Sequence, residues 1–356
     1  MALKVLVVDD SALMRKHLSQ LFAGAGFEVL LARDGREAVE QVLAHKPDVV
    51  SLDINMPGLD GLTALSLIMA ARPTPVVMVS SLTTKGATAT LEALAMGAVD
   101  YVAKPGGTIS LSIDAIAGEL IEKVRVAASA KMKPSNGRLS ARLREEREQI
   151  QSESRRAPAP ATLKTGEFGL VLVGVSTGGP RTLEEILPQI PAGFPWPVLV
   201  AQHMPGTFTG TLASRLDNLC ALRVVEVARP ERIEPGMVYI ARGGTDMVVA
   251  KRGDQLVALP KPESPQHLWH PSVTVLVESA LATLPPERLI GVELTGMGYD
   301  GAEAMAKLHR AGGKTIAEAE ESAVVFGMPK ELIERGGATV VLPAAEIARQ
   351  LTRWLT

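Results

Sequence analysis

A serine among glycines directly follows a short apolar segment near the middle of the chain. The segment Phe168 to Val173 has the length and composition of a buried strand, and the turn GVSTGGP at residues 174–180 carries Ser176. A hydroxyl at such a turn lies beside the free amides of a helix N-terminus, which can hold an oxyanion while the hydroxyl attacks a carbonyl. The same turn can instead cap a helix or bind phosphate, so this segment alone leaves both interpretations open.

A serine nucleophile needs a base, and the chain has six histidines. His203 follows the apolar segment Val198 to Ala201, the next predicted strand after the one before Ser176. Because neighbouring parallel strands end at the same sheet edge, we predict His203 as the base. His270 is the rival candidate, and a loop-capping role is the alternative for His203.

Asp300 is the candidate carboxylate that would orient the base. It lies just past the apolar segment Leu289 to Leu294, at a position that also suits a helix N-cap. Because Ser176 and His203 also follow strands, we favour the orienting role. The chain order Ser, His, Asp differs from the Ser, Asp, His order of α/β-hydrolases, which argues against an ordinary lipase or esterase.

The segments around these residues resemble the catalytic domain of the chemotaxis protein-glutamate methylesterases. The matching segments are Val173 to Pro180, Gln202 to Pro205, His270 to Val273, Leu294 to Gly298 and Asp300 to Ala302. The resemblance implies Ser176 as nucleophile, His203 as base and Asp300 as orienter, with amides near Thr177 and Met297 as oxyanion donors. The family more often has Asn where this chain has Tyr299, a difference that bears on substrate access.

This resemblance also implies the reaction. Such a serine hydrolase demethylates glutamate methyl esters on methyl-accepting chemoreceptors, deamidates glutamines there, and so gives sensory adaptation. It needs no cofactor for the ester reaction. The alternative function is a catalytically inactive scaffold that binds receptors, but we expect such a protein to lack a triad member.

Charged and hydroxyl side chains also end the predicted strands of the first half. Asp9 and Asp10 follow the first strand, Asp53 ends the third, Ser80 the fourth and Lys104 the fifth. Three carboxylates together favour a bound cation such as Mg²⁺, and a lysine with a hydroxyl opposite them can bind an anion. This set predicts a phosphoryl-transfer site, and solvated loop charges are the alternative.

The first half resembles a response-regulator receiver domain over roughly residues 1–125. The matching residues are Val7 to Ser11, Asp53, Met56 to Gly58, Asp60 and Gly61, Ser80, and Lys104 and Pro105. The resemblance implies two-component signalling, with phosphorylation of Asp53 by a histidine kinase. The implied Mg²⁺ ligands are Asp9, Asp10, Asp53 and the Asn55 carbonyl. The implied switch residues are Ser80, Tyr101 and Lys104.

Alternating strand and helix patterns must position both sites. In the first half the predicted strands lie near 27–31, 48–52, 75–79 and 99–103 after the first, and the predicted helices near 34–45, 59–70, 86–96 and 111–129. We therefore expect an α/β protein: a flavodoxin-like doubly wound parallel sheet, then a Rossmann-like α/β methylesterase domain with a β-hairpin insert. Residues 235–241, 246–250 and 255–259 are assigned to antiparallel hairpin strands.

Composition sets the domain organisation and excludes some classes. We predict domains at 1–125 and 166–356, joined by a charged, Pro-containing linker at 126–165 with a short helix in its middle. A net charge of −2, with no basic helix-turn-helix after residue 165, argues against nucleic acid as a partner. Cys220 is the single cysteine, and no apolar run approaches the ~20 residues of a bilayer span. We therefore expect a cytoplasmic phosphoprotein with no membrane insertion.

Overall fold

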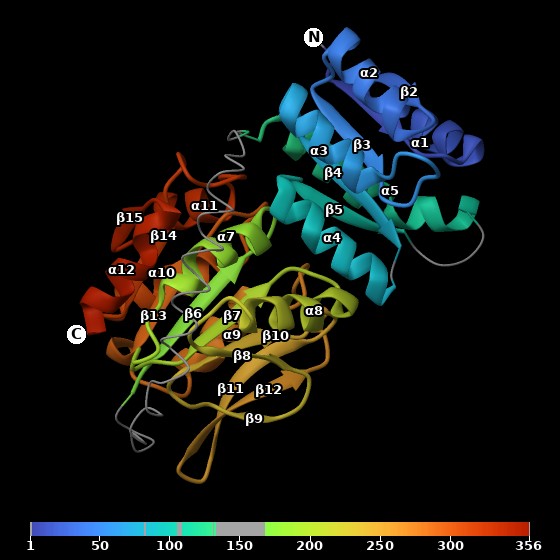
Figure 1. Cartoon of the computed structure of the whole chain (residues 1–356). Coiled ribbons are helices and arrows are strands. Elements are labelled where there is room, and N and C mark those ends of the chain that lie inside the picture. Colours follow the sequence, from blue (N-terminus) through green and yellow to red (C-terminus); the bar gives the residue numbers. More distant parts are fainter. Residues whose placement is uncertain (1, 82, 105–108, 131, 133–167, 356) are drawn as a thin grey trace. The chain divides into compact units, whose positions relative to one another are not determined.

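The computed structural model describes residues 2–81, 83–104, 109–130, 132 and 168–355, in two compact units, Met1–Asn136 and Gly137–Thr356. Each unit has its own parallel sheet (Figure 1). The predicted linker helix lies outside the described residues. Within the described ranges, no helix has both the length and the apolar character needed to cross a bilayer.

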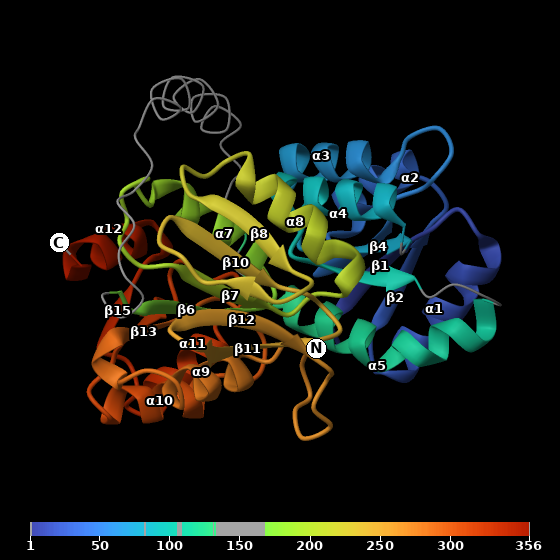
Figure 2. The same ribbon diagram turned by 90° about the horizontal axis from the view of Figure 1, so that it is seen from below.

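The first unit is a five-stranded parallel sheet in the order β2-β1-β3-β4-β5. Its strands are β1 (Lys4–Val8), β2 (Glu28–Ala32), β3 (Val49–Asp53), β4 (Val76–Ser81) and β5 (Asp100–Lys104). Its helices are α1 (Ala12–Gly24), α2 (Gly35–His45), α3 (Gly61–Ala71), α4 (Thr84–Met96) and α5 (Ile109–Ala128). Helices α1 and α5 cover one face and α2, α3 and α4 the other (Figure 2). The predicted doubly wound fold is confirmed.

Local sequence explains these elements. The central strands β1 and β3 are mostly apolar and almost entirely buried, because helices cover both faces of the sheet. Side-chain oxygens of Ser11, Asp34 and Asp60 accept hydrogen bonds from the first-turn amides of α1, α2 and α3. These caps start the helices just beyond the strand ends, where the charged side chains gather.

The second unit has a seven-stranded parallel sheet in the order β15-β14-β13-β6-β7-β10-β8. Its strands are β6 (Leu170–Val175), β7 (Val198–Gln202), β8 (Arg223–Val227), β10 (Met237–Ala241), β13 (Leu289–Glu293), β14 (Lys314–Glu318) and β15 (Val340–Leu342). Its α-helices are α7 (Gly179–Ile186), α8 (Gly206–Asp217), α9 (Val273–Leu281), α10 (Ala302–Arg310), α11 (Met328–Glu334) and α12 (Ala344–Leu355). Short 3₁₀ helices cover Leu187–Gln189 and Pro286–Arg288. Helices α7, α8 and α12 cover one face and α9, α10 and α11 the other (Figure 2).

The assignment of residues 235–241 to an antiparallel hairpin is wrong. These residues form β10, which pairs parallel with β7 and β8 inside the main sheet. The hairpin consists of β11 (Asp246–Arg252) and β12 (Gln255–Lys261), with the short strand β9 (Glu231–Arg232) beside β12. Because β10 is buried on both faces, its apolar run is that of a central parallel strand, and the turn after it leads into the hairpin.

Sheet order explains how distant residues meet. Strand β6 lies between β13 and β7, and all three run parallel. Ser176 follows β6, His203 follows β7, and Asp300 lies in the loop after β13. The three loops therefore leave one sheet edge side by side.

A buried acid ends β13. Glu293 has an exposed fraction of 0%, and within the described part of the chain neither carboxyl oxygen has a hydrogen-bond partner. A Cβ added at Gly174 or Gly301 would come within 2.8 Å of a Glu293 carboxyl oxygen, so glycines make the space for this side chain. Burial, and then the charge of Asp300, raise the pKa of Glu293 well above its ordinary value. The folded protein therefore holds Glu293 as the neutral acid.

Replacing Glu293 with Gln should remove a pH dependence of stability. The folded state keeps this proton while the unfolded chain releases it near its ordinary pKa, so wild type loses stability as pH rises above about 4.3, at up to about 1.4 kcal/mol per pH unit. All three tryptophans (196, 269 and 354) lie in the second unit, so their fluorescence during urea unfolding follows it.

The control for this experiment is Glu318→Gln. Glu318 is equally buried but accepts hydrogen bonds from the Thr295 amide at 2.7 Å and the Ser322 hydroxyl at 2.8 Å. We expect Glu318→Gln to destabilise the unit by about 1–3 kcal/mol at neutral pH. Stability curves of wild type and Glu293→Gln that stay parallel from pH 4 upward would contradict the neutral acid.

Candidate functional site

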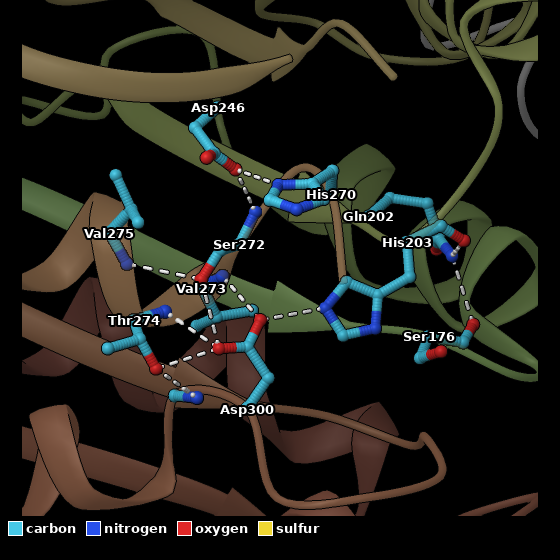
Figure 3. A network of polar contacts seen from close by, with 11 residues as sticks. Ser176, Gln202, His203, Asp246, His270, Ser272, Val273, Thr274, Val275 and Asp300 are labelled. Carbon is cyan, nitrogen blue, oxygen red and sulfur yellow. Dashed lines mark hydrogen bonds and ion pairs between the residues drawn. The ribbon is translucent and has the colours of Figure 1, made fainter. Parts of the chain in front are cut away.

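His203 and Asp300 form a close pair although they are far apart in sequence. His203 Nε2 lies 2.9 Å from Asp300 Oδ2. The other ring nitrogen, Nδ1, is buried and has no hydrogen-bond partner among the described residues. Figure 3 shows Ser176 on the Nδ1 side of the ring, so the imidazole lies between the carboxylate and the serine. The structure thus brings together the three residues that the sequence singles out.

Asp300 is held by the N-terminus of α9. Its carboxylate accepts hydrogen bonds from the Val273 amide at 2.7 Å, the Thr274 amide at 3.1 Å, the Thr274 hydroxyl at 2.7 Å and the Ser272 hydroxyl at 3.1 Å (Figure 3). Burial acts to raise the pKa of Asp300, but His203 and these hydrogen bonds outweigh it and lower the pKa to about 2. Asp300 is therefore ionised at neutral pH.

The structure argues against the N-cap alternative for Asp300. Helix α10 begins after Gly301 and has no side-chain cap, so Asp300 does not serve as its N-cap. Because an ionised carboxylate only accepts hydrogen bonds, Nε2 of His203 carries a proton, and in the neutral imidazole Nδ1 is then an acceptor. Sequence analysis did not identify Ser272 and Thr274 as supports, because their role depends on which helix lies against the loop.

A tight turn presents Ser176. The Ser176 amide donates to the Thr295 carbonyl at 2.9 Å, and the Gly179 amide donates to the Ser176 carbonyl at 2.8 Å. Gly178 has φ +79°, in the left-handed region that favours glycine. A Cβ added at Gly296 would come within 2.8 Å of the Ser176 Cβ, so a side chain there would displace the serine.

Gln202 joins the backbones of the serine and the histidine. Its Nε2 donates to the Ser176 carbonyl at 3.0 Å and to the His203 carbonyl at 3.1 Å (Figure 3). The residue is 2% exposed, and its amide oxygen fills the space that a Cβ on Gly179 would occupy. Sequence analysis placed Gln202 in a matching segment but gave it no role.

The rival histidine has a carboxylate partner of its own. His270 Nδ1 lies 2.9 Å from Asp246 Oδ1, at the start of β11, and the Ser272 amide donates to the same oxygen at 2.8 Å (Figure 3). Asp246 is 1% exposed. These contacts fix the residues just before α9. They favour His203 as the base, because His203 is the histidine bound to Asp300.

Two aromatic rings continue the site from His203. Trp269 stacks on the imidazole, with ring centroids 5.8 Å apart and planes 5° apart. The Tyr299 ring meets Trp269 edge-on at 5.2 Å. Gly298 makes room for the indole, since a Cβ there would come within 2.7 Å of it. Sequence analysis noted Tyr299 but missed Trp269, because nothing in its local pattern distinguishes it from a core residue.

The predicted oxyanion donors lie next to the same turn. Thr177 is buried, and its carbonyl accepts a hydrogen bond from the Thr295 hydroxyl at 2.9 Å. Met297 follows Gly296, which packs against Ser176. Within the described residues, no backbone hydrogen bond is donated by the Met297 amide. The roles of both amides remain predictions.

The first unit gathers its acidic residues at the strand ends. Carboxylate oxygens of Asp9, Asp10 and Asp53 lie within 4.8 Å of one another. Lys104 Nζ lies 3.0 Å from Asp9 Oδ2 and 2.8 Å from Asp53 Oδ2. The Asn55 amide donates to Asp53 Oδ1 at 3.3 Å, which keeps that loop beside the cluster. Three carboxylates at one point fit the oxygen ligands that a hard divalent cation takes.

Electrostatics couples Asp53 to Lys104. Burial raises the pKa of Asp53, and the charge of Lys104 offsets part of this rise. Burial disfavours the charged form of Lys104, but Asp53 and Asp9 outweigh it and raise the pKa of Lys104. Lys104 therefore keeps its positive charge beside the carboxylates.

The remaining predicted switch residues are both buried. The Ser80 hydroxyl accepts a hydrogen bond from the Thr90 hydroxyl at 2.8 Å, so it faces α4. Tyr101 is 4% exposed, and Lys123 Nζ lies 5.1 Å from its ring centroid. Their roles as switch residues stay predictions.

Comparisons with known proteins identify two families along the chain. The CheB methylesterase family matches residues 171–351, and the response regulator receiver domain matches residues 5–113. The protein-glutamate methylesterase/protein-glutamine glutaminase 3 of Rhodospirillum rubrum is 57% identical over 358 residues, which cover 99% of this chain and 96% of that protein. The corresponding protein 2 of Rhodopseudomonas palustris is 52% identical over 359 residues, covering 99% and 98%.

A solved structure supports the same assignment. The crystal structure of the Thermotoga maritima CheB methylesterase catalytic domain matches with a TM-score of 0.51 and 40% identity, and the match covers 52% of this chain and 98% of that one. The methylesterase match includes Ser176, His203 and Asp300, and the receiver match includes Asp53 and Lys104. This chain therefore belongs to the CheB methylesterase family and carries a response regulator receiver domain before the methylesterase domain.

Proposed function

We propose that this protein is a phosphorylation-activated protein-glutamate methylesterase and protein-glutamine glutaminase. It hydrolyses γ-glutamyl methyl esters on methyl-accepting chemoreceptors and deamidates glutamines there, which resets the sensitivity of the receptors. The observation that supports this best is the His203–Asp300 pair, with Ser176 at the unpartnered Nδ1 of the ring. A complete set of these groups argues against the inactive scaffold.

The reaction follows from the protonation states of the three groups. His203 Nδ1 takes the hydroxyl proton as Ser176 attacks the ester carbonyl, and ionised Asp300 stabilises the imidazolium that forms. The bond to the methoxy group then breaks, and His203 gives its proton to the departing methanol. Water, activated by the same nitrogen, hydrolyses the acyl-enzyme and restores the serine. A glutamine substrate releases ammonia at the step where an ester releases methanol.

Backbone amides of Thr177 and Met297 are the proposed donors to the developing oxyanion. Thr177 follows the serine just before α7, and Met297 lies beyond Gly296, which touches Ser176. Two such amide donors can stabilise negative charge that the ground-state ester lacks.

Asp53 is the proposed phosphate acceptor, with a histidine kinase as donor. Asp9, Asp10, Asp53 and the Asn55 carbonyl would hold a divalent cation, for which we propose Mg²⁺. When bound, this ion supplies positive charge that offsets the charge of the incoming phosphoryl group. Lys104 places a second, fixed positive charge beside Asp53, and Ser80 and Tyr101 are the proposed switch residues.

Replacing Ser176 with Ala tests the nucleophile. Because the acyl-enzyme cannot form, we expect methanol release from methylated receptor to fall at least about 10³-fold. Urea unfolding of the variant should match that of wild type, since the change removes one oxygen. Equal methanol release by the two proteins would exclude the enzyme proposal.

Gln202→Glu tests whether the bridge between the two backbones positions the base. A Glu carboxyl carries at most one proton, so it cannot donate to the Ser176 and His203 carbonyls together, and we expect kcat to fall about 10–100-fold while KM stays nearly constant. Gln189→Glu is the control, since Gln189 is exposed and bonds only within its own segment. Wild-type kcat in a folded Gln202→Glu variant would remove this role.

Asp53→Asn tests activation. We expect the variant to keep the basal esterase rate but to lose its stimulation by acetyl phosphate with Mg²⁺, because the amide cannot accept phosphate. Asp34→Asn is the control: Asp34 caps α2, and Asn caps a helix equally well. Stimulation that persists in Asp53→Asn would place the phosphate acceptor elsewhere.

A further inference from the structure

Exposed apolar side chains gather next to the esterase site. In the described part of the second unit, the large apolar residues that are exposed are Leu268 at 75%, Tyr299 at 54% and Val341 at 46%. Val341 lies on β15 and is the kind of single exposed apolar residue that needs no explanation. Leu268 and Tyr299 differ from it, because both adjoin Trp269, one along the chain and one by ring contact.

Trp269 connects these two side chains to the reacting groups. Its indole covers one face of the His203 imidazole, and the Tyr299 ring stands against the indole. Gly298, which has φ +88°, has no side chain and so leaves room for the indole. We call Leu268, Trp269 and Tyr299 the apolar shelf. The shelf begins at the base itself and continues to exposed side chains.

We propose that the apolar shelf binds the substrate protein, by contacting an apolar side chain that neighbours the reacting glutamate on the same helix face. This inference rests on the proposed function and names the part of the substrate that the site recognises besides the ester. The occupant is thus a segment of a methylated receptor helix.

Helix geometry brings such a neighbour within reach. The ester carbonyl must approach Ser176 and therefore lies against His203, whose ring face the shelf covers. On a helix, residues three or four positions from the reacting glutamate have Cβ atoms about 5–6 Å from its own. This spacing is close to the 5.8 Å between the centroids of the His203 and Trp269 rings and the 5.2 Å between those of Trp269 and Tyr299. A substrate helix that presents its ester to Ser176 therefore carries those neighbours over Trp269 and Tyr299.

The chemistry of the shelf sets the kind of neighbour. No residue of the apolar shelf carries a charge. Contact with a substrate side chain would therefore stabilise the complex by removing apolar surface from water rather than by ion pairing. A Leu, Val or Ala on the substrate helix fits this surface better than a charged residue. Binding through the shelf should accordingly depend little on ionic strength.

The test compares two substrates in full-length protein. One is a methylated receptor fragment, and the other is the γ-methyl ester of N-acetylglutamate, which has no neighbouring side chains. For Leu268→Ser, Tyr299→Ser and the double variant, the ratio of kcat/KM on receptor to kcat/KM on the small ester should fall, by about tenfold or more in the double variant. The loss should lie mainly in KM. Val341→Ser is the matched control and should leave the ratio unchanged.

The substrate can be varied as well. Serine in place of the apolar residues three and four positions from the methylated glutamate should weaken turnover by wild type and have little further effect on the double variant. A ratio unchanged in all variants overturns the shelf as a binding surface. A higher basal rate of the shelf variants on receptor would also overturn the proposal, because it would indicate that the shelf contacts the receiver domain of the same chain.

The proposed function can fail separately. If Ser176→Ala keeps full turnover of the small ester, the hydrolase mechanism is wrong whatever the ratio. If Ser176→Ala is inactive and the ratio in the shelf variants matches wild type, the mechanism stands and the shelf alone is refuted.

Discussion

The hydrogen bond between His203 and Asp300 depends on the N-terminus of α9. His203, together with backbone amides and hydroxyls of residues 272–274, binds the Asp300 carboxylate and keeps it ionised, although it is buried. An ionised Asp300 fixes the proton on Nε2 of His203 and leaves Nδ1 to face Ser176. The order β13-β6-β7 brings the three loops together, but the helix end sets the protonation state on which the proposed chemistry depends.

Glu293 is a second buried acid, and in the part of the chain that the structure describes it lacks the hydrogen-bond donors that Asp300 has. It is as buried as any residue of the sheet and lies near Asp300, yet no helix end or hydroxyl within the described residues binds its carboxyl group. The pKa of Asp300 is lowered while the pKa of Glu293 is raised, because one acid has donors and the other has none. Of these two neighbouring acids, Asp300 is ionised and Glu293 is neutral, and the difference lies in their hydrogen bonds.

Much of this could be predicted from sequence. Apolar runs that end in Asp53, Lys104, Ser176 or His203 indicate parallel strands with functional residues at their carboxyl ends, and the fold class is confirmed. The parallel pairing of strand β10 could not be predicted in this way. A buried parallel strand and a hairpin strand have similar apolar residues and differ only in the strands that lie beside them. Trp269 was missed for a related reason: stacking on His203 depends on how the loop before α9 returns to the site.

The β11–β12 hairpin looks like an addition to the edge of an α/β domain, but Asp246 joins it to the residues just before α9 that support Asp300. This one carboxylate accepts hydrogen bonds from the Ser264 and Ser272 amides and pairs with His270, so the first residue of the insert secures the chain that enters α9. A smaller hydrolase cut from this chain could not simply discard residues 246–261. The hairpin is therefore part of the scaffold that holds the chain entering α9.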